Sequence, residues 1–268
     1  MFKPSHRAAL RAAAFVCSFV CSAGSAHAQA WPSKPIRMVV PYAAGGPGDV
    51  IARMVAKAAG EKLQQTVIID NKGGAGGTIG VDATLKSPAD GYTFALAAQG
   101  PFAGMPNLTK TPYTIGDVQY LTFVARGPAV VAVSAKVPVA NLAELVKLAK
   151  AQPGKLNYGS AGPGTTPHIA GELLKQEAGV DLTHVPYKGA GPAVTALLGG
   201  EIEVAIVDLL NVLPHVGAGK IKVLAVASPS RAPQLPDVPT TKEAGLPGLV
   251  MDTNYGVIAP LGIPADVL

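Results

Sequence analysis

The residues best placed to do chemistry surround a glycine-rich turn near the start of the chain. Gly45, Gly46 and Gly48 follow the short apolar run 36–40 and precede apolar residues at helical spacing. This pattern predicts a strand, a tight loop and a helix start. Because unpaired backbone N–H groups and the positive end of the helix dipole meet at such a start, the stretch predicts an anion-binding site.

The same combination of a glycine-rich loop and a helix start occurs a second time. Three groups of residues recur at one constant offset: Tyr42, Gly46-Pro47-Gly48 and Lys72-Gly73 match Tyr158, Gly162-Pro163-Gly164 and Lys188-Gly189. Both sets lie in the same predicted context of strand, loop, helix and strand. The repeat predicts two similar α/β halves, each of which directs a helix N-terminus at a ligand.

Hydrolysis is the alternative function that the residue types leave open. Ser160, His168 and Asp208 could form a nucleophilic triad in the second half. However, the chain around Ser160 reads Tyr-Gly-Ser-Ala-Gly, which lacks the first glycine of a nucleophile elbow. His168 also falls one turn into a predicted helix, where a histidine more often caps or contacts a ligand than acts as a base. A secreted α/β serine hydrolase using Ser160 is therefore the less favoured interpretation.

We expect no metal, nucleotide or other cofactor. His168 and Glu172 could present two metal ligands on one helix face, but no third ligand accompanies them. Neither glycine loop has the Gly-Lys-Ser/Thr of a P-loop, and Pro167 stands where the third glycine of a dinucleotide motif belongs. Two further side chains each allow two interpretations. Asp49 is either a helix cap or a ligand contact, and Lys188 either contacts an anion or forms part of a turn.

The first 28 residues have the pattern of a signal peptide, which predicts that the protein is exported. Lys3, Arg7 and Arg11 precede a run of small and apolar residues that ends in Ala26-His27-Ala28, which is typical of a signal peptide cleaved after Ala28. Both cysteines fall inside this segment, so we expect neither disulfides nor thiol catalysis in the mature chain. Removal of the segment lowers the formal charge from +5 to +2, because three of the 22 Lys and Arg are lost and all 17 Asp and Glu remain. With 5% aromatic residues as well, the composition does not favour nucleic-acid binding.

Strands and helices alternate through the mature chain, which predicts an α/β protein with parallel sheets covered on both faces. We expect lobe 1 to comprise residues 29–128 and 250–268 and lobe 2 to comprise 129–249. The long Val- and Ala-rich stretch 120–137 is predicted to cross between the lobes, and 250–259 to return. The predicted strands are 36–40, 66–70, 93–97, 120–137, 156–158, 182–185, 203–207, 222–227 and 250–259. The predicted helices are 49–64, 79–86, 141–151, 168–178, 192–198, 209–218 and 241–245, and 101–116 is predicted to be irregular.

The chain resembles the Bug-type periplasmic substrate-binding proteins of tripartite tricarboxylate transporters. The matching segments include Pro41-Tyr42-Ala43-Ala44-Gly45-Gly46 with Asp49, Asn71-Lys72-Gly73-Gly74-Ala75-Gly76-Gly77, Ser87-Pro88-Ala89-Asp90-Gly91-Tyr92-Thr93, Gly159-Ser160-Ala161-Gly162-Pro163-Gly164-Thr165 with His168, and Val185-Pro186-Tyr187-Lys188-Gly189. The resemblance implies a two-lobed periplasmic-binding-protein fold of type II (Venus-flytrap). It also implies that relatives continue past Pro264, so we expect the C-terminal part of the first lobe to be truncated in this sequence.

The resemblance implies non-catalytic capture of a small carboxylate ligand in the periplasm and its delivery to membrane transporter subunits. A monomer is expected, with a sensor kinase as a further possible partner. From the first lobe the implied ligand-binding residues are Tyr42, Ala44, Gly45, Gly46 and Asp49. From the second they are Ser160, Ala161, Gly164, Thr165, Thr166, His168, Tyr187, Lys188 and Asp208. Ligand choice is predicted to depend on Gln99, Phe102, Tyr187 and Asp208.

Overall fold

The computed structural model describes residues 31–268, so the predicted signal peptide and its two cysteines lie outside the described residues. The compact unit that comprises Lys34–Leu268 contains both sheets and is described below. Within the described part of the chain, no helix is long and apolar enough to cross a membrane.

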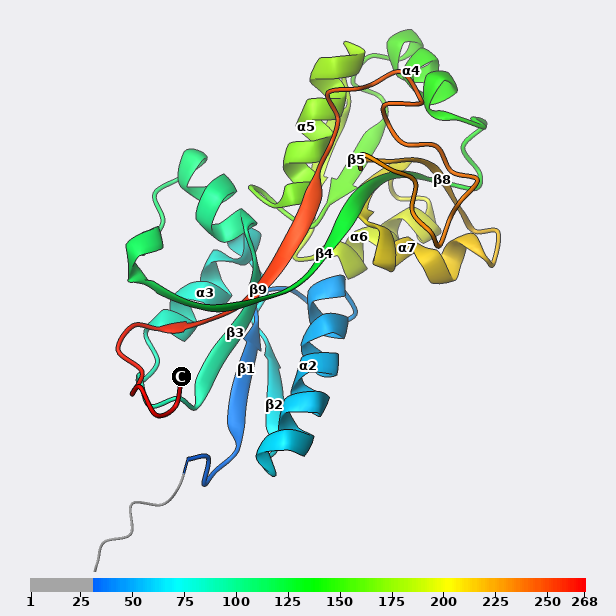
Figure 1. The fold of residues 1–268 in the computed structure, drawn as a ribbon. Coiled ribbons are helices and arrows are strands. Elements are labelled where there is room, and N and C mark those ends of the chain that lie inside the picture. The colour runs from blue at the N-terminus through cyan, green and yellow to red at the C-terminus, as the bar shows by residue number, and fades with distance from the viewer. Residues whose placement is uncertain (1–30) are drawn as a thin grey trace, which may run out of the picture. The chain divides into compact units, whose positions relative to one another are not determined.

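The first sheet has the strand order β2-β1-β3-β9-β4 (Figure 1). Its strands are β1 (Ile36–Val40), β2 (Val67–Asn71), β3 (Thr93–Ala98), β4 (Val118–Ser134) and β9 (Asp252–Pro260). β1 pairs in parallel with β2 and β3, whereas β9 pairs antiparallel with β3 and β4. The prediction of parallel pairing is therefore correct for β1–β3 and wrong for β9 and β4.

The second sheet repeats this arrangement in the order β8-β4-β7-β5-β6. It contains β5 (Asn157–Ser160), β6 (Thr183–Pro186), β7 (Val204–Asp208) and β8 (Ile221–Val226). β5 pairs in parallel with β6 and β7, and β4 lies antiparallel between β7 and β8. Each sheet thus consists of a parallel part followed by antiparallel strands.

β4 belongs to both sheets. Its residues from Val118 to Pro128 pair with β9, and its residues from Ala129 onward pair with β7 and β8. The exchange of partners between Pro128 and Ala129 makes this strand the connection between the two lobes, and Figure 1 shows β4 and β9 running side by side through it.

Helices cover both faces of each sheet, because successive strand residues point to opposite sides. In the first lobe Met38 and Val40 pack toward α2 (Pro47–Leu63), whereas Val39 packs with Val81 of α3 (Thr78–Leu85). In the second lobe the covering helices are α4 (Leu142–Ala151), α5 (Thr166–Ala178), α6 (Ala190–Gly199) and α7 (Leu209–Val216). Alternate β4 residues there enter two separate cores, one with α4 and α5 and one with α6 and α7.

Two regions differ from the sequence predictions. The segment predicted to be irregular contains the short helices η2 (Gly100–Gly104), η3 (Met105–Asn107) and η4 (Ile115–Asp117), and another, η1 (Ala75–Gly77), precedes α3. The helix predicted at 241–245 is instead a series of turns. There Glu243 accepts hydrogen bonds from the Thr240 N–H and from Arg231, so its carboxylate ties these turns to the preceding loop.

The sequence repeat marks related loops whose residues are not structurally equivalent. In the first lobe Pro47 is the first residue of α2. In the second lobe Pro163 lies in the loop, and the proline in the first turn of α5 is Pro167. The second loop is therefore longer before its helix begins, and Gly162 and Gly164 adopt positive φ there.

Gly171 allows α5 to lie directly on the buried ring of Tyr158. A Cβ at Gly171 would be 2.3 Å from Tyr158 Cε2. We predict that Gly171→Ala lowers the free energy of unfolding by roughly 1–3 kcal/mol, since overpacking outweighs the gain in helix propensity. Urea unfolding followed by circular dichroism measures this change. Gly199→Ala, in the exposed last turn of α6, is the matched control and should be neutral or slightly stabilising; a Gly171→Ala variant as stable as this control would contradict the prediction.

Candidate functional site

The first glycine loop is held by the buried carboxylate of Asp49. Its Oδ2 accepts hydrogen bonds from the Gly45 N–H (3.1 Å) and from Arg53 Nε (3.0 Å), and its Oδ1 accepts one from Asn71 Nδ2 (3.0 Å). Asn71 Nδ2 also lies 3.2 Å from the Tyr42 carbonyl oxygen. Asp49 therefore ties the loop to its own helix and, through Asn71, to the end of β2.

Two opposing effects set the charge of Asp49. Burial raises its pKa, but the hydrogen bonds from Arg53, Gly45 and Asn71 together with the Arg53 charge hold it below the usual value. Asp49 thus remains ionised at neutral pH and keeps its role as an acceptor. Its function is to position the loop, because all its recorded partners belong to the first lobe.

The second glycine loop is held by a serine and two histidines. Ser160, which is fully buried, accepts a hydrogen bond from the Gly162 N–H (3.1 Å) and shares one with His184 Nε2 (2.7 Å). The Gly164 N–H donates to His168 Nδ1 at 3.1 Å. The two imidazole rings stack with their centroids 4.3 Å apart, so both ends of the loop rest on one pair of rings.

Aromatic and charged neighbours complete this support. The Tyr158 ring also stacks on His184, with ring centroids 4.7 Å apart, and its hydroxyl donates a hydrogen bond to Glu172 Oε1 at 2.6 Å. Lys175 forms an ion pair with Glu172 at 3.1 Å. Glu172 is thus engaged by Tyr158 and Lys175, and no group of three or more potential metal-ligating residues occurs in the described part of the chain.

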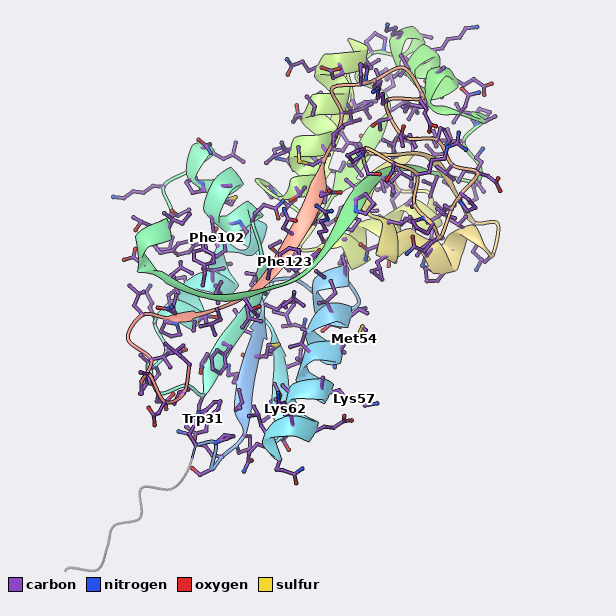
Figure 2. The ribbon with its side chains drawn as sticks, in the orientation of Figure 1. Trp31, Met54, Lys57, Lys62, Phe102 and Phe123 are labelled. Carbon is purple, nitrogen blue, oxygen red and sulfur yellow. The ribbon has the colours of Figure 1, made fainter. Side chains whose placement is uncertain are left out.

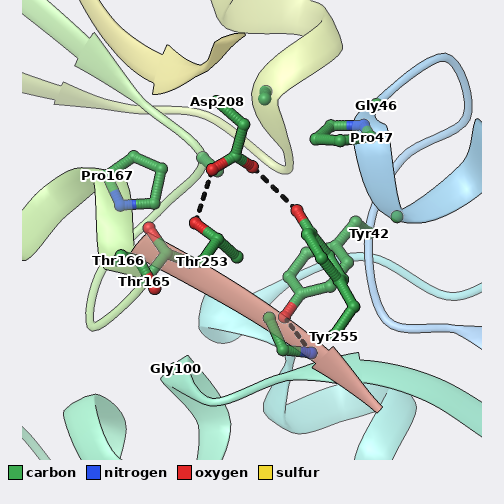
Figure 3. Close-up of a pocket in the computed structure, with 14 residues that line it drawn as sticks. Tyr42, Gly46, Pro47, Gly100, Thr165, Thr166, Pro167, Asp208, Thr253 and Tyr255 are labelled. Carbon is green, nitrogen blue, oxygen red and sulfur yellow. Dashed lines mark hydrogen bonds between the residues drawn. The ribbon is translucent and has the colours of Figure 1, made fainter. Parts of the chain in front are cut away.

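Both loops lead to one cavity between the lobes (Figure 3). The start of α2, at Gly46, Pro47 and Gly48, forms one wall, and the start of α5, at Thr165, Thr166 and Pro167, forms another. Within residues 31–268 the Thr166 Oγ1 is buried without a hydrogen-bond partner. The cavity leaves about 20 Å³ open to the centre of a water molecule, so a larger solute can enter only if its walls move apart.

The lobes meet through backbone at the edge of this cavity. The Ala43 N–H donates to the Lys188 carbonyl oxygen at 3.0 Å. A Cβ at Gly104 would lie 1.9 Å from the Gly164 carbonyl oxygen, and one at Gly76 would lie 2.1 Å from the Pro163 carbonyl oxygen. We call this set of contacts the glycine seam. It requires side-chain-free residues, because any Cβ at Gly76 or Gly104 would overlap the opposite backbone.

A buried polar cluster closes the base of the cavity. The Asp208 carboxylate accepts hydrogen bonds from Thr253 Oγ1 (2.5 Å, to Oδ1) and from the Tyr255 hydroxyl (2.7 Å, to Oδ2), as Figure 3 shows. Tyr42 lies beside them, with its hydroxyl accepting from the Ala98 N–H at 3.3 Å. Because Asp208 ends β7 while Thr253 and Tyr255 lie on β9, this cluster links the second lobe to the strand that enters the first.

The sequence and the fold are both similar to those of known proteins. The family model described as the tripartite tricarboxylate transporter family receptor matches residues 51–268. The chain belongs to this receptor family. BugT of Bordetella pertussis is 36% identical over 264 residues, which cover 96% of this chain and 81% of BugT.

Two solved structures are similar throughout both lobes. An R. palustris protein with adipate is 36% identical and superposes with a TM-score of 0.85, covering 88% of this chain and 80% of that one. MatC from Rhodopseudomonas palustris with bound malate is 31% identical with a TM-score of 0.84, covering 88% of this chain and 81% of MatC. The chain therefore has the two-lobed type II fold of periplasmic binding proteins and belongs to a family of binding proteins rather than hydrolases.

The structure of this receptor brings only some of the predicted residues to the cavity wall. Those that line it are Tyr42, Gly46, Ala161, Thr165, Thr166 and Asp208. Ala44, Gly45 and Tyr187 line a separate outer hollow beside α6. Asp49, Ser160 and His168 lie behind the loops and support them, whereas Gly164 belongs to the second loop and to the glycine seam. Lys188 contributes its carbonyl to the glycine seam while its side chain is exposed, which favours the interpretation as part of a turn.

The hydrolase triad is not assembled in this receptor. Ser160 contacts His184 rather than His168, and Asp208 contacts Thr253 and Tyr255 rather than a histidine. Two residues predicted to determine ligand choice are engaged elsewhere. Gln99 bonds to the backbone of β9, and Phe102 packs edge-on against Tyr120.

The sequence analysis of this receptor missed two kinds of site residue. Ala98, Gly100, Thr253 and Tyr255 reach the cavity because β3 and β9 end there side by side, and that antiparallel pairing has no local sequence signal. His184 and Asn71 are also absent from the predicted binding residues, although both hold a glycine loop in place. Their hydrogen bonds to Ser160 and Asp49 depend on neighbouring strands, which a pattern along one strand does not reveal.

The histidine pair predicts a pH-dependent stability. Burial, together with the nearby His168 charge, lowers the pKa of His184 to about 4, and burial also lowers the pKa of His168. Histidine in the unfolded chain has a pKa near 6.5. Between about pH 6.5 and 4 the unfolded state therefore binds protons that the folded state does not bind. Stability should therefore be complete above pH 6.5 and should decline as the pH falls toward 4.

His184→Gln should flatten this decline, because the side chain no longer titrates. Urea unfolding at pH 4.5 and 7.5 measures the difference in free energy between the two pH values. His215→Gln, on α7 outside the histidine pair, should keep the wild-type difference. The same pH dependence in His184→Gln and wild type would contradict the prediction.

Proposed function

We propose that this protein captures a small carboxylate-bearing solute in the periplasm and delivers it to a tripartite tricarboxylate-type membrane transporter. The observation that carries the proposal is the meeting of two helix N-termini at one cavity. The first turns of α2 and α5 both line it, and their backbone N–H groups and dipoles favour an anion. Relatives of this chain have been solved with adipate and with malate, both small carboxylates.

The cavity supports recognition of a carboxylate without a basic side chain. None of the fourteen residues that line it is Lys, Arg or His. The available donors are the backbone N–H groups of the helix starts and the unpartnered hydroxyl of Thr166. Charge-assisted hydrogen bonds from such donors contribute on the order of 1.5–3 kcal/mol each.

Capture requires the lobes to separate and close again around the solute. The predicted division into 29–128 with 250–268 and 129–249 is supported by the exchange of β4 partners between Pro128 and Ala129. Bending there would open the glycine seam while leaving each sheet intact. The closed form presents a surface in which both lobes are juxtaposed, and a transporter can distinguish this surface from that of the open form.

Thr166→Val tests the carboxylate site. The substitution keeps the shape of the side chain and removes the unpartnered hydroxyl, so we expect about 10- to 100-fold weaker binding of malate or adipate, equivalent to about 1.5–3 kcal/mol. Isothermal titration calorimetry measures the Kd. Thr195→Val, on the exposed side of α6, is the matched control and should bind as wild type does. Binding of neither acid by the wild-type protein would overturn the proposed ligand class.

Gly104→Ala tests capture by closure. Gly104 has helical dihedral angles that alanine accepts, but the added Cβ would lie 1.9 Å from the Gly164 carbonyl oxygen across the glycine seam. We predict a folded protein that cannot close fully and binds its solute at least tenfold more weakly. Small-angle scattering should show a ligand-dependent decrease of the radius of gyration in wild type and in the control Gly116→Ala, and none in Gly104→Ala. A full decrease in Gly104→Ala would contradict the prediction.

Delivery to a transporter is tested in cells that lack this gene. Uptake of the radiolabelled solute should be restored by the wild-type gene and by Gly116→Ala, but not by Gly104→Ala. Unchanged uptake in the deletion strain would show that transport does not depend on this protein. That result would overturn delivery to the transporter but not solute binding.

A further inference from the structure

Asp208 is an unusual residue for the wall of an anion-binding cavity. Its carboxyl group is the only acidic side chain among the fourteen residues that line the cavity, and no basic side chain accompanies it there. Only 4% of the residue is exposed. A solute carboxylate that enters this cavity would therefore be placed near a second, buried negative charge, and two like charges that are close together and partly removed from water repel each other strongly.

The position of Asp208 in the fold directs its side chain toward the cavity. Asp208 is the N-cap residue of α7, yet its side chain makes no capping hydrogen bond to that helix. It is turned instead toward Thr253 and Tyr255 of β9 (Figure 3). Each carboxylate oxygen accepts one of these hydrogen bonds, so each retains a lone pair on which a proton can be placed.

The charged groups around Asp208 do not neutralise it. Tyr42 and Tyr255 face it from the first lobe, and burial raises the pKa of both phenols, so they remain uncharged. Asp252, on β9, adds a further negative charge. Arg126 and Arg231 line an outer groove that also reaches Asp208. Met54 of α2, labelled in Figure 2, lines the same groove. Neither arginine forms an ion pair with Asp208 among the described residues, and Arg231 is paired with Glu243.

The environment of Asp208 places its titration within the physiological range. Burial raises the pKa of this carboxyl to about 6, against the lowering effect of the hydrogen bonds from Thr253 and Tyr255. The group is therefore mostly ionised at pH 7 when the cavity holds no anion. A neighbouring anion raises the pKa further, because it disfavours the charged form.

We propose that Asp208 takes up one proton from solvent when the solute carboxylate enters the cavity, and that the neutral carboxyl then donates a hydrogen bond to the solute. The inference rests on the proposed function and specifies how this site accepts its ligand. Protonation removes the repulsion between two buried carboxylates and replaces it with a hydrogen bond. Asp208 thereby couples solute affinity to pH. Because the protonated carboxyl donates a hydrogen bond, the solute group that faces it must be a hydrogen-bond acceptor.

The coupling has a defined sign. Above about pH 6 the free protein holds Asp208 ionised, and the complex holds it protonated up to a higher pH. Binding then consumes one proton, so the Kd should rise up to tenfold for each pH unit in this window. Malate and adipate are fully ionised dicarboxylates between pH 7 and 8.5, so their own titration does not contribute there.

The experiment is calorimetric titration of the full mature protein with malate and with adipate at pH 7.0, 7.5, 8.0 and 8.5, each in two buffers of different ionisation enthalpy. We expect wild type to take up close to one proton per solute at pH 7.0 and to lose affinity as the pH rises. Asp208→Asn should take up none and show a constant Kd. Asp237→Asn, which removes an exposed carboxyl in the second lobe, should match wild type.

Tyr255→Phe provides a second variant that keeps the buried ring. Loss of its hydroxyl removes one donor to Asp208 and raises the pKa of the carboxyl, so the loss of affinity should begin at a higher pH than in wild type. This variant tests the inference independently if Asp208→Asn does not fold.

Three results would overturn the inference. Equal proton uptake in wild type and Asp208→Asn would show that another group takes up the proton. Absence of any uptake in wild type would show that Asp208 remains ionised beside the solute. Tighter binding of aspartate than of malate without proton uptake would show that an ionised Asp208 faces an ammonium group. Failure of malate, adipate and aspartate to bind at any pH would instead overturn the proposed function, and the inference with it.

Discussion

The site depends on the continuity of one strand, β4, through both sheets. Because the strand pairs with β9 up to Pro128 and with β7 and β8 from Ala129, the two lobes are joined by an element that is hydrogen-bonded along nearly its whole length. Its backbone keeps each glycine loop attached to the other through paired strands, while the change of partners leaves a point where bending would disrupt neither sheet. A flexible linker at this position would not bring two helix starts repeatedly to the same cavity.

The two glycine loops are supported by different chemistry. Asp49 holds the first loop with an ionised carboxylate that remains an acceptor at any pH near neutrality. Neutral imidazoles hold the second, and His168 can accept the Gly164 N–H only while its Nδ1 is unprotonated. Acidification therefore weakens one wall of the cavity before the other. Asp208, at the base, responds in the opposite sense, because its protonation favours an anionic solute.

Local signals predicted most of the fold. The apolar runs at β1, β3 and β7 and the helical spacing in α2 and α5 appear in the sequence because each element buries one face or both. The glycine loops were predictable for the same reason, since tight turns before helices need residues without side chains. The structure also confirmed that the long Val-rich stretch is a single strand.

Pairing between distant segments was not predictable from these signals. Nothing near Thr253 or Tyr255 indicates that β9 lies antiparallel to β3 and carries both residues to Asp208. The contact of Ser160 with His184 was hidden for the same reason: the less favoured triad considered His168, which is closer in sequence, but β6 lies beside β5 and brings His184 to Ser160. The matched Gly-Pro-Gly motifs likewise have the same sequence but occupy different positions relative to the helices that follow them.

The glycine seam separates the parts of the molecule that can change from those that cannot. Where the lobes touch at Gly104 and Gly164 the contact is made by backbone, so no side chain there can be exchanged to suit another solute. The residues at the base of the cavity carry no such restriction, because they contact one another through side chains. Homologous proteins can therefore acquire new ligands through substitutions at the base of the cavity, while the closing movement at the glycine seam stays the same.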